Sequence, residues 1–245
     1  MKKKVVAVIP ARMASSRFPG KPLAQILDLP MIEHVRRRAL LCKVLDEVYV
    51  ATCDKAIFDV VSSYGGRTIM TKDTHLRCTD RVEEAVGHLK ADIVVMLQGD
   101  EPLFDSQIVE KLVIPLQEDN ALVCTNLLTP ILRSQDLQDP DIVKALLDVQ
   151  GNILYFSRAA VPYVRARHNH RVFRQTGLSA FSVDFLKKFS ELEPTPLEIT
   201  ESVDFWRILE HRFPIKAVIY EGESVGVDRQ DDIAIIEAIL QQDKK

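Results

Sequence analysis

Segments rich in β-branched residues alternate with segments of helical spacing, and this alternation constrains the fold more than any other feature of the chain. Val5–Ile9 and Ile93–Leu97 are continuous apolar runs, and Glu47–Thr52 is a third β-branched segment. Continuous apolar runs are typical of strands covered on both faces, as in a parallel sheet. The segments of helical spacing between them are Met31–Leu41, Ile57–Tyr64 and Asp80–Leu89. This order predicts a Rossmann-like α/β fold with a mostly parallel sheet flanked by helices.

The pattern changes after Leu122, where short strand-like segments follow one another with little helix between them. These segments are Val123–Leu128, Val143–Leu147, Ile153–Tyr155 and Gly177–Phe181. Their hairpin-like spacing predicts a smaller mixed-sheet extension, approximately residues 122–195, within a single domain that spans residues 1–245. A helix over Pro196–Leu209, a strand over Ile215–Tyr220 and an amphipathic helix over Asp231–Gln241 are expected to close the fold.

Composition argues against several classes of function. The 245 residues carry a formal net charge of −3 and a pI near 6.1, so no global attraction to nucleic acid or to an anionic membrane is expected. Met1–Lys4 and Val5–Ile9 resemble the start of a signal peptide, but Pro10 ends the apolar run too early for secretion or membrane insertion. The four cysteines contain no Cys-x-x-Cys pair, which indicates reduced thiols in a cytoplasmic protein.

A loop rich in cations follows the first predicted strand. Arg12, Arg17 and Lys21 lie within ten residues, among small residues that allow backbone amides to approach an anion. Ligands bind at the carboxyl ends of parallel strands, so this loop is a candidate triphosphate site, although a solvated basic loop is the alternative. The chain has neither a Walker A motif nor a G-x-G-x-x-G motif here, which argues against P-loop NTPases and dinucleotide-dependent dehydrogenases.

Acidic residues follow two other predicted strands. Asp100 lies in Gln98–Pro102, directly after the strongest strand signal, and Asp228 follows the late strand. Carboxylate oxygens suit Mg²⁺, which needs only one or two of them when phosphates supply the other ligands. Asp100 could instead cap the helix that follows it, whereas Asp231 or Asp232 could cap the last helix and leave Asp228 free. Together with the cationic loop, Asp100 predicts a magnesium site, for which Asp228 is a reasonable second ligand.

At these residues the chain resembles the 3-deoxy-manno-octulosonate (Kdo) cytidylyltransferases, which make CMP-Kdo for lipopolysaccharide biosynthesis. The similarity runs nearly from end to end and consists of several separate motifs in the family's order. They are Ile9–Arg12, Arg17–Leu23, Met31-Ile32, His34-Val35, Val50–Thr52, Gln98–Pro102, Val143-Lys144, Leu154–Arg158, Pro162 and Gly226–Asp228. A weaker similarity to the acylneuraminate cytidylyltransferases is confined mostly to the first loop.

The resemblance implies a nucleotide-diphospho-sugar transferase-like fold, a magnesium-dependent nucleotidyltransferase and a homodimer. The anomeric hydroxyl of the sugar would attack the α-phosphate of CTP, and pyrophosphate would leave without a covalent enzyme intermediate. The implied catalytic residues are Arg12, Arg17, Lys21 and Asp100, with the metal on Asp100 and Asp228. The implied nucleotide contacts are Pro10, Ala11, Arg12, Lys21, Thr79, Arg81 and Gln98, with Thr71–Arg81 closing over the cytidine. The implied sugar contacts are Gln98, Arg158, Arg165, Gln175, Phe181, Asp204 and Phe205.

Three stretches depart from the family's usual residues. The chain has Arg77–Arg81 where Ser-Gly-Thr-Glu-Arg is usual, Gln175–Phe181 lacks an imidazole and two phenol hydroxyls, and Asp204-Phe205 replaces a Glu-Gln pair. These changes indicate either drift or a different acceptor, since polar groups in a substrate pocket discriminate strongly. The alternative acceptors are a modified ulosonate such as an 8-amino Kdo analogue, a nonulosonate or a phosphonate. A non-catalytic nucleotide-binding module is the alternative from another class.

Overall fold

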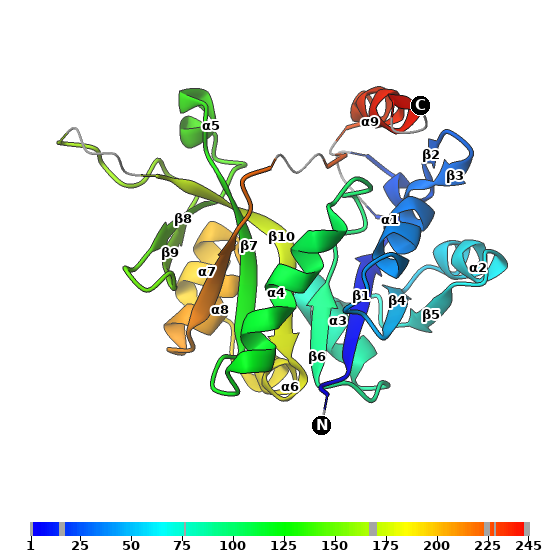
Figure 1. Cartoon of the computed structure of the whole chain (residues 1–245), viewed down its shortest axis with the longest axis horizontal. Helices are drawn as coiled ribbons and strands as arrows, with labels where there is room; N and C mark the ends of the chain where they lie inside the picture. Colours follow the sequence, from blue (N-terminus) through cyan, green and yellow to red (C-terminus); the bar gives the residue numbers. More distant parts are fainter. Residues whose placement is uncertain are drawn as a thin grey trace. The chain divides into compact units, whose positions relative to one another are not determined.

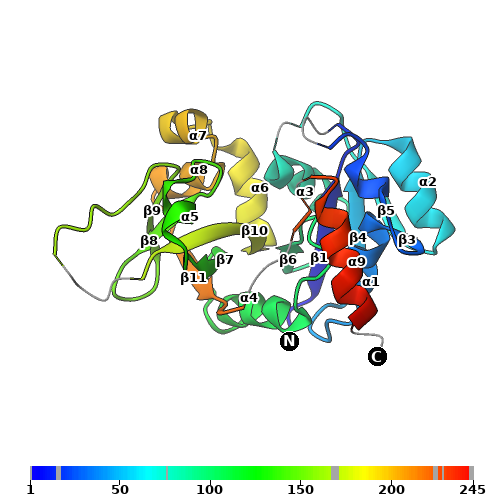
Figure 2. The same cartoon turned by 90° about the horizontal axis from the view of Figure 1, so that it is seen from above.

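The chain folds into two compact units, and its structure, a computed structural model, is shown in Figures 1 and 2. The structure describes residues 2–14, 18–75, 77–166, 171–222, 226–227 and 229–242. The first unit consists of Met1–Glu110 and Ser224–Lys245, and the second consists of Lys111–Glu223. The predicted extension, residues 122–195, lies within the second unit.

Parallel strands form the sheet of the first unit (Figure 1). β1 (Val5–Ala11) pairs with β4 (Glu47–Thr52) on one side and with β6 (Ile93–Met96) on the other, and β5 (Arg67–Met70) pairs with β4. Every residue of β1 and β6 is buried. The Rossmann-like parallel sheet predicted from the sequence is therefore confirmed. β5 was not predicted, because its residues are only partly buried and carry no continuous apolar signal.

Helices cover both faces of this sheet. The connecting helices are α1 (Met31–Leu40), α2 (Lys55–Ser63) and α3 (Cys78–Val86). Seen from above in Figure 2, α1 and α3 lie on opposite sides of β1, as right-handed crossovers leading away from and back past β1 require. α4 (Ser106–Glu118), which contains Pro115, was not predicted. Within the described residues, no helix has the length and apolar content to cross a membrane.

The last helix returns to the beginning of the chain. α9 (Asp232–Gln242) packs against the hairpin of β2 (Gln25–Ile26) and β3 (Leu29–Pro30), where Glu237 accepts a hydrogen bond from the backbone N–H of Leu27 at 2.8 Å. The buried side chains of this cluster are Ile26, Met31, Val227 and Ile236. This packing fixes the segment around Val227 beside the loop that follows β1, and so brings a late motif to an early one.

A mixed sheet forms the second unit. Its strands are β7 (Cys124–Pro130), β8 (Lys144–Leu147), β9 (Ile153–Ser157), β10 (Phe173–Ser182) and β11 (Ile215–Ile219). β10 is antiparallel to β7 and β8, β8 is antiparallel to β9, and β11 is parallel to β7. The predicted mixed sheet is therefore confirmed: β7, β9 and β10 are longer than the sequence indicated, and β8 and β11 are each one residue shorter.

Short helices flank the mixed sheet. They are α5 (Ser134–Gln138), α6 (Val183–Glu191), α7 (Pro196–Glu201) and α8 (Phe205–Glu210). α5 and α6 were not predicted. The prediction of one helix over Pro196–Leu209 is wrong, because Ser202 adopts a left-handed backbone conformation with φ 54° and ends α7.

A buried ion pair holds α7 and α8 together across this break. Arg207 donates to Glu198 through Nε at 2.8 Å and through Nη2 at 2.5 Å, and the two side chains are only 8% and 4% exposed. The guanidinium also lies 4.5 Å from the centroid of the Phe189 ring. Removing one partner of such a pair leaves the other charge buried without compensation.

Arg207→Met is expected to lower the free energy of unfolding by about 3 kcal/mol, because Glu198 keeps its burial and loses its counter-charge. Urea unfolding followed by circular dichroism measures this change. Arg133→Met is the matched control, since Arg133 is 68% exposed in its pair with Asp136 and exposed pairs contribute less than about 1 kcal/mol. A loss no larger in Arg207→Met than in the control contradicts the assigned role of the buried pair.

Candidate active site

Lys21 and Asp100 lie in contact at the carboxyl edge of the parallel sheet. Lys21 follows Gly20, whose φ of 75° turns the chain, and its Nζ donates to Asp100 Oδ2 at 2.5 Å and to the carbonyl of Val227 at 2.8 Å. The backbone N–H of Val227 donates in turn to the carbonyl of Asp100 at 2.9 Å. Three segments that are distant in the sequence therefore meet at one ammonium group.

A glycine allows the loop after β6 to approach the end of β1. A Cβ atom on Gly99 would lie 3.3 Å from the carbonyl oxygen of Pro10 and 3.4 Å from Cδ1 of Ile32. The distance to the backbone oxygen is tighter than an ordinary side-chain contact, so a larger residue would require the two backbone segments to move apart by a few tenths of an ångström. The Gln98-Gly99-Asp100 motif thus has a local steric reason for its middle residue.

Asp100 presents an oxygen that is available to a cation. Its side chain is 34% exposed, and Oδ1 makes no hydrogen bond with any residue in the described ranges. No group of three or more His, Cys, Asp or Glu side chains suited to a metal exists among those residues. Asp228, the other predicted ligand, and Arg17, a predicted catalytic residue, lie outside the described residues. Of the two predicted metal ligands, Asp100 therefore lies within the described residues.

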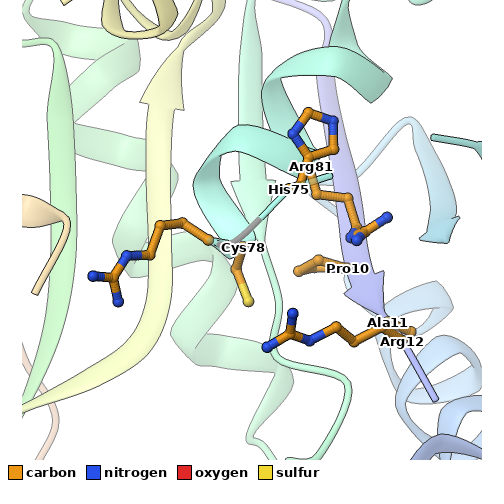
Figure 3. A pocket seen from close by; sticks show the side chains of 7 residues that line it. Pro10, Ala11, Arg12, His75, Cys78 and Arg81 are labelled. Atoms are coloured by element: carbon orange, nitrogen blue, oxygen red, sulfur yellow. The ribbon is translucent and has the colours of Figure 1, made fainter. Parts of the chain in front are cut away.

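A cationic pocket opens at the end of β1 (Figure 3). Its volume is about 50 Å³, and it is lined by Pro10, Ala11, Arg12, His75, Arg77, Cys78 and Arg81. The side chain of Arg12 is exposed and makes no hydrogen bond or ion pair with the part of the chain that the structure describes. A guanidinium with no counter-charge there, in a pocket with two further arginines, favours an anionic ligand.

Arg81 attaches the segment after β5 to α3. It is only 3% exposed, and its Nη1 donates to Oγ1 of Thr71 at 2.5 Å and to the carbonyl of Lys72 at 3.2 Å. Thr79, also predicted to bind nucleotide, is 1% exposed on the same helix. The structure therefore places Arg81 in the wall of the pocket, where it holds one side of that wall in position, whereas Thr79 is buried on α3 and is not among the residues that line the pocket.

Glu84 holds the other side of the same wall. Its Oε2 contacts Nε2 of His75 and accepts the backbone N–H of Lys72 at 3.0 Å. Burial alone would raise the pKa of Glu84, but the hydrogen bonds from His75 and Lys72 outweigh it and leave this pKa below its ordinary value. Glu84 is therefore an ionised carboxylate at neutral pH.

Gln98 lies between the pocket and Asp100 along the chain. Its Oε1 is 4.0 Å from Sγ of Cys78, which is exposed at the first residue of α3. Gln98 is predicted to contact both substrates, whereas His75, Arg77 and Cys78 are not among the predicted contacts. All three lie in the segment Thr71–Arg81, which is predicted to close over the cytidine. The sequence therefore indicated the segment that lines the pocket but not the individual residues.

The predicted sugar contact Arg158 is part of a backbone network in the second unit. Its Nε donates to the carbonyl of Glu201 at 2.6 Å, and its Nη1 donates to the carbonyl of Pro140 at 2.8 Å. Its own carbonyl accepts from Nζ of Lys144 at 2.6 Å. Lys144 is fully buried, and this burial lowers the pKa of its ammonium group. Arg158 is therefore anchored by neutral carbonyl groups, which leave its positive charge uncancelled by these contacts.

The other predicted sugar contacts have varied surroundings in this unit. Phe181 is fully buried and its ring centroid lies 5.9 Å from that of Phe205, which follows Asp204 at the start of α8. The backbone N–H of Gln175 donates to the carbonyl of Val143 at 2.8 Å. Arg165 is exposed. The contacts of these residues with a sugar stay predictions.

Comparison with known proteins identifies the family. The sequence profile described as cytidylyltransferase matches residues 6–225. The 3-deoxy-manno-octulosonate cytidylyltransferase of Syntrophotalea carbinolica is 42% identical over 245 residues, covering 96% of this chain and 98% of the relative. The protein of the same name from Syntrophobacter fumaroxidans is 41% identical, covering 98% of each chain.

Solved structures agree with this relationship. A structure of CMP:2-keto-3-deoxy-manno-octonic acid synthetase complexed with CTP has a TM-score of 0.93 and 36% identity, covering 98% of this chain and 99% of that one. The 4-diphosphocytidyl-2C-methyl-D-erythritol synthase of Anaerococcus prevotii has a TM-score of 0.66 at 16% identity, covering 98% of this chain and 100% of that one, and shares the fold. The chain belongs to the 3-deoxy-manno-octulosonate cytidylyltransferase family.

Proposed function

We propose that this protein transfers CMP from CTP to the anomeric hydroxyl of Kdo, or of a closely related acidic sugar, and releases pyrophosphate. The observation that carries the proposal is the contact between Lys21 and Asp100 at the carboxyl edge of the sheet, in the same unit as the cationic pocket. Two further findings support the proposal. Relatives that match nearly the whole chain are named 3-deoxy-manno-octulosonate cytidylyltransferase, and a similar solved structure contains bound CTP.

The proposed reaction requires positioning and charge neutralisation. The oxygen of the sugar hydroxyl forms a bond to the α-phosphorus of CTP and gives up its proton to water, while the bond from that phosphorus to the bridging oxygen breaks. Pyrophosphate leaves with the electron pair of the broken bond. Arg12 and Lys21 are cations suited to hold the phosphates while negative charge develops on the leaving group. No side chain has to become a covalent intermediate.

We propose Mg²⁺ as the cofactor, with Asp100 as a ligand and Asp228 as the second predicted ligand. The residues that the structure describes fit this ion, because one exposed carboxylate oxygen without a hydrogen bond is enough when phosphate oxygens and water supply the remaining ligands. The ammonium of Lys21 already balances the other oxygen of Asp100. When bound, Mg²⁺ would neutralise phosphate charge as a Lewis acid.

We propose that the protein acts as a cytoplasmic homodimer. Support comes from apolar side chains that remain exposed on the second unit, where Leu154 and Tyr155 of β9 and Ile199 of α7 are 60%, 38% and 68% exposed. Neighbouring exposed apolar residues of this size are typical of surfaces that another chain covers. Leu154 and Tyr155 lie within Val143–Phe156, the segment that we expect at the interface between the two subunits.

Purified protein is expected to release pyrophosphate when CTP, Mg²⁺ and Kdo are present together, and not when any one of the three is omitted. A coupled pyrophosphate assay with a panel of acceptors measures this and identifies the acceptor. The panel contains Kdo, its 8-amino analogue, a nonulosonate and a phosphonate. Turnover with another acceptor and none with Kdo would assign the activity to that acceptor, and CTP binding without turnover on any acceptor would favour the non-catalytic module.

Asp100→Asn is expected to lower kcat/KM for CTP by about 100-fold, because the amide removes the charge that a metal requires. The chain should still fold, since the amide oxygen can accept the hydrogen bond from Lys21, but the unfolding temperature should fall because the ammonium of Lys21 loses its counter-charge. Asp59→Asn is the matched control, because Asp59 is 56% exposed and pairs with Lys55 on α2. A rate in Asp100→Asn within threefold of the control would contradict the metal assignment.

A further inference from the structure

We propose that His75, oriented by Glu84, reads the exocyclic amino group of cytosine and so makes the pocket select CTP over UTP. His75 is then a specificity-determining residue, and Glu84 is a positioning residue that acts through it. The inference rests on the proposed function in one respect, which is that the cationic pocket binds the nucleotide.

The geometry fixes His75 from two directions. On α3, Arg81 and Glu84 are three residues apart and therefore lie on the same face of the helix. Arg81 binds Thr71 and the carbonyl of Lys72, while Glu84 binds the N–H of Lys72 and the ring of His75. The segment is thus fastened at its start and at its end. His75 is only 17% exposed in this arrangement and lines the pocket.

The contact with Glu84 determines which nitrogen of His75 carries a proton. An ionised carboxylate can only accept hydrogen bonds, so Nε2 of the ring must donate to it. In a neutral imidazole the other nitrogen, Nδ1, is then an acceptor. Nδ1 makes no hydrogen bond with any residue in the described parts of the chain. A neutral His75 therefore adds one nitrogen acceptor to a lining that otherwise carries cationic donors.

An acceptor at this place suits a base and does not suit a phosphate. Triphosphate oxygens are acceptors and would be repelled by the lone pair of Nδ1, whereas the amino group of cytosine is a donor. Uracil carries a carbonyl oxygen at the corresponding position, which would face the same lone pair. Pro10 and Ala11, at the end of β1, add an apolar wall that can contact the face of a flat ring (Figure 3). Ribose hydroxyls can also donate, but CTP and UTP share them.

CTP and UTP differ in the group that His75 is proposed to contact, so the ratio of their affinities reports on this contact. Calorimetric titration of each nucleotide with Mg²⁺ and without a sugar measures this ratio. His75→Phe keeps a ring and removes both nitrogens, so the ratio of the two affinities should fall about fivefold to tenfold, the scale of one hydrogen bond and one avoided repulsion. His75→Asn should restore part of the preference, because its amide can place an oxygen near the position of Nδ1. Asp59→Asn should leave the ratio unchanged.

Glu84→Gln separates the positioning role from a purely structural one. Its amide can either accept from Nε2 or donate to it, so both tautomers of His75 become possible and the CTP preference should fall by about threefold. Long-range ¹H–¹⁵N spectra of the histidine rings report the tautomer directly. The wild-type protein should show His75 protonated on Nε2, and Glu84→Gln should show a mixture of the two forms.

Two results would overturn the inference. One is a CTP-to-UTP ratio in folded His75→Phe within twofold of wild type, and the other is a wild-type spectrum with His75 protonated on Nδ1. Because the spectrum needs no variant, it decides the matter even if His75→Phe fails to fold. The protein could also prefer CTP through His75 and yet release no pyrophosphate with any sugar. That result would support this inference and contradict the proposed function.

Discussion

The ion pair between Lys21 and Asp100 is the interaction on which the arrangement of the first unit's site depends. It joins residues 79 positions apart in the sequence, and the carbonyl of Val227 adds a third segment. Lys21 is only 14% exposed, so its ammonium would be costly to bury without these partners. The same contact that stabilises the loop after β1 therefore also sets the position of a carboxylate where phosphate and metal charges would meet.

A second set of contacts shapes the cationic pocket, which belongs to the same unit as the Lys21–Asp100 pair. All of these contacts are made by side chains of α3. Arg81 is balanced by neutral oxygens of Thr71 and Lys72, whereas Glu84 is balanced by His75 and a backbone N–H. Glu84, the only carboxylate in this set, binds His75 and Lys72 in the wall of the pocket. It makes no ion pair with Arg12, whose charge has no partner within the described residues. The positive charge of Arg12 remains available to a ligand because no carboxylate within the described residues pairs with it.

Burial explains which elements could be predicted. β1 and β6 are buried at every position, and their continuous apolar sequences predict them as strands. β5 is half-exposed and α4 contains Pro115, so each violates the pattern by which its kind is recognised. The break at Ser202 was missed for another reason. The residues on both sides of it have helical spacing, whereas the left-handed backbone of Ser202 and the pairing of Glu198 with Arg207 across the break depend on the tertiary structure.

The sequence by itself determined the parallel sheet, the cationic loop, the acidic residue after β6 and the family, because strand burial and short motifs are written in neighbouring residues. Only the tertiary structure decided that Glu84 faces His75, that Arg81 fastens the segment after β5, and that Val227 closes on Lys21. Periodicity shows which side of an element is buried. It contains no information about which polar atom on one element meets which atom on another, since that depends on the packing of the whole unit.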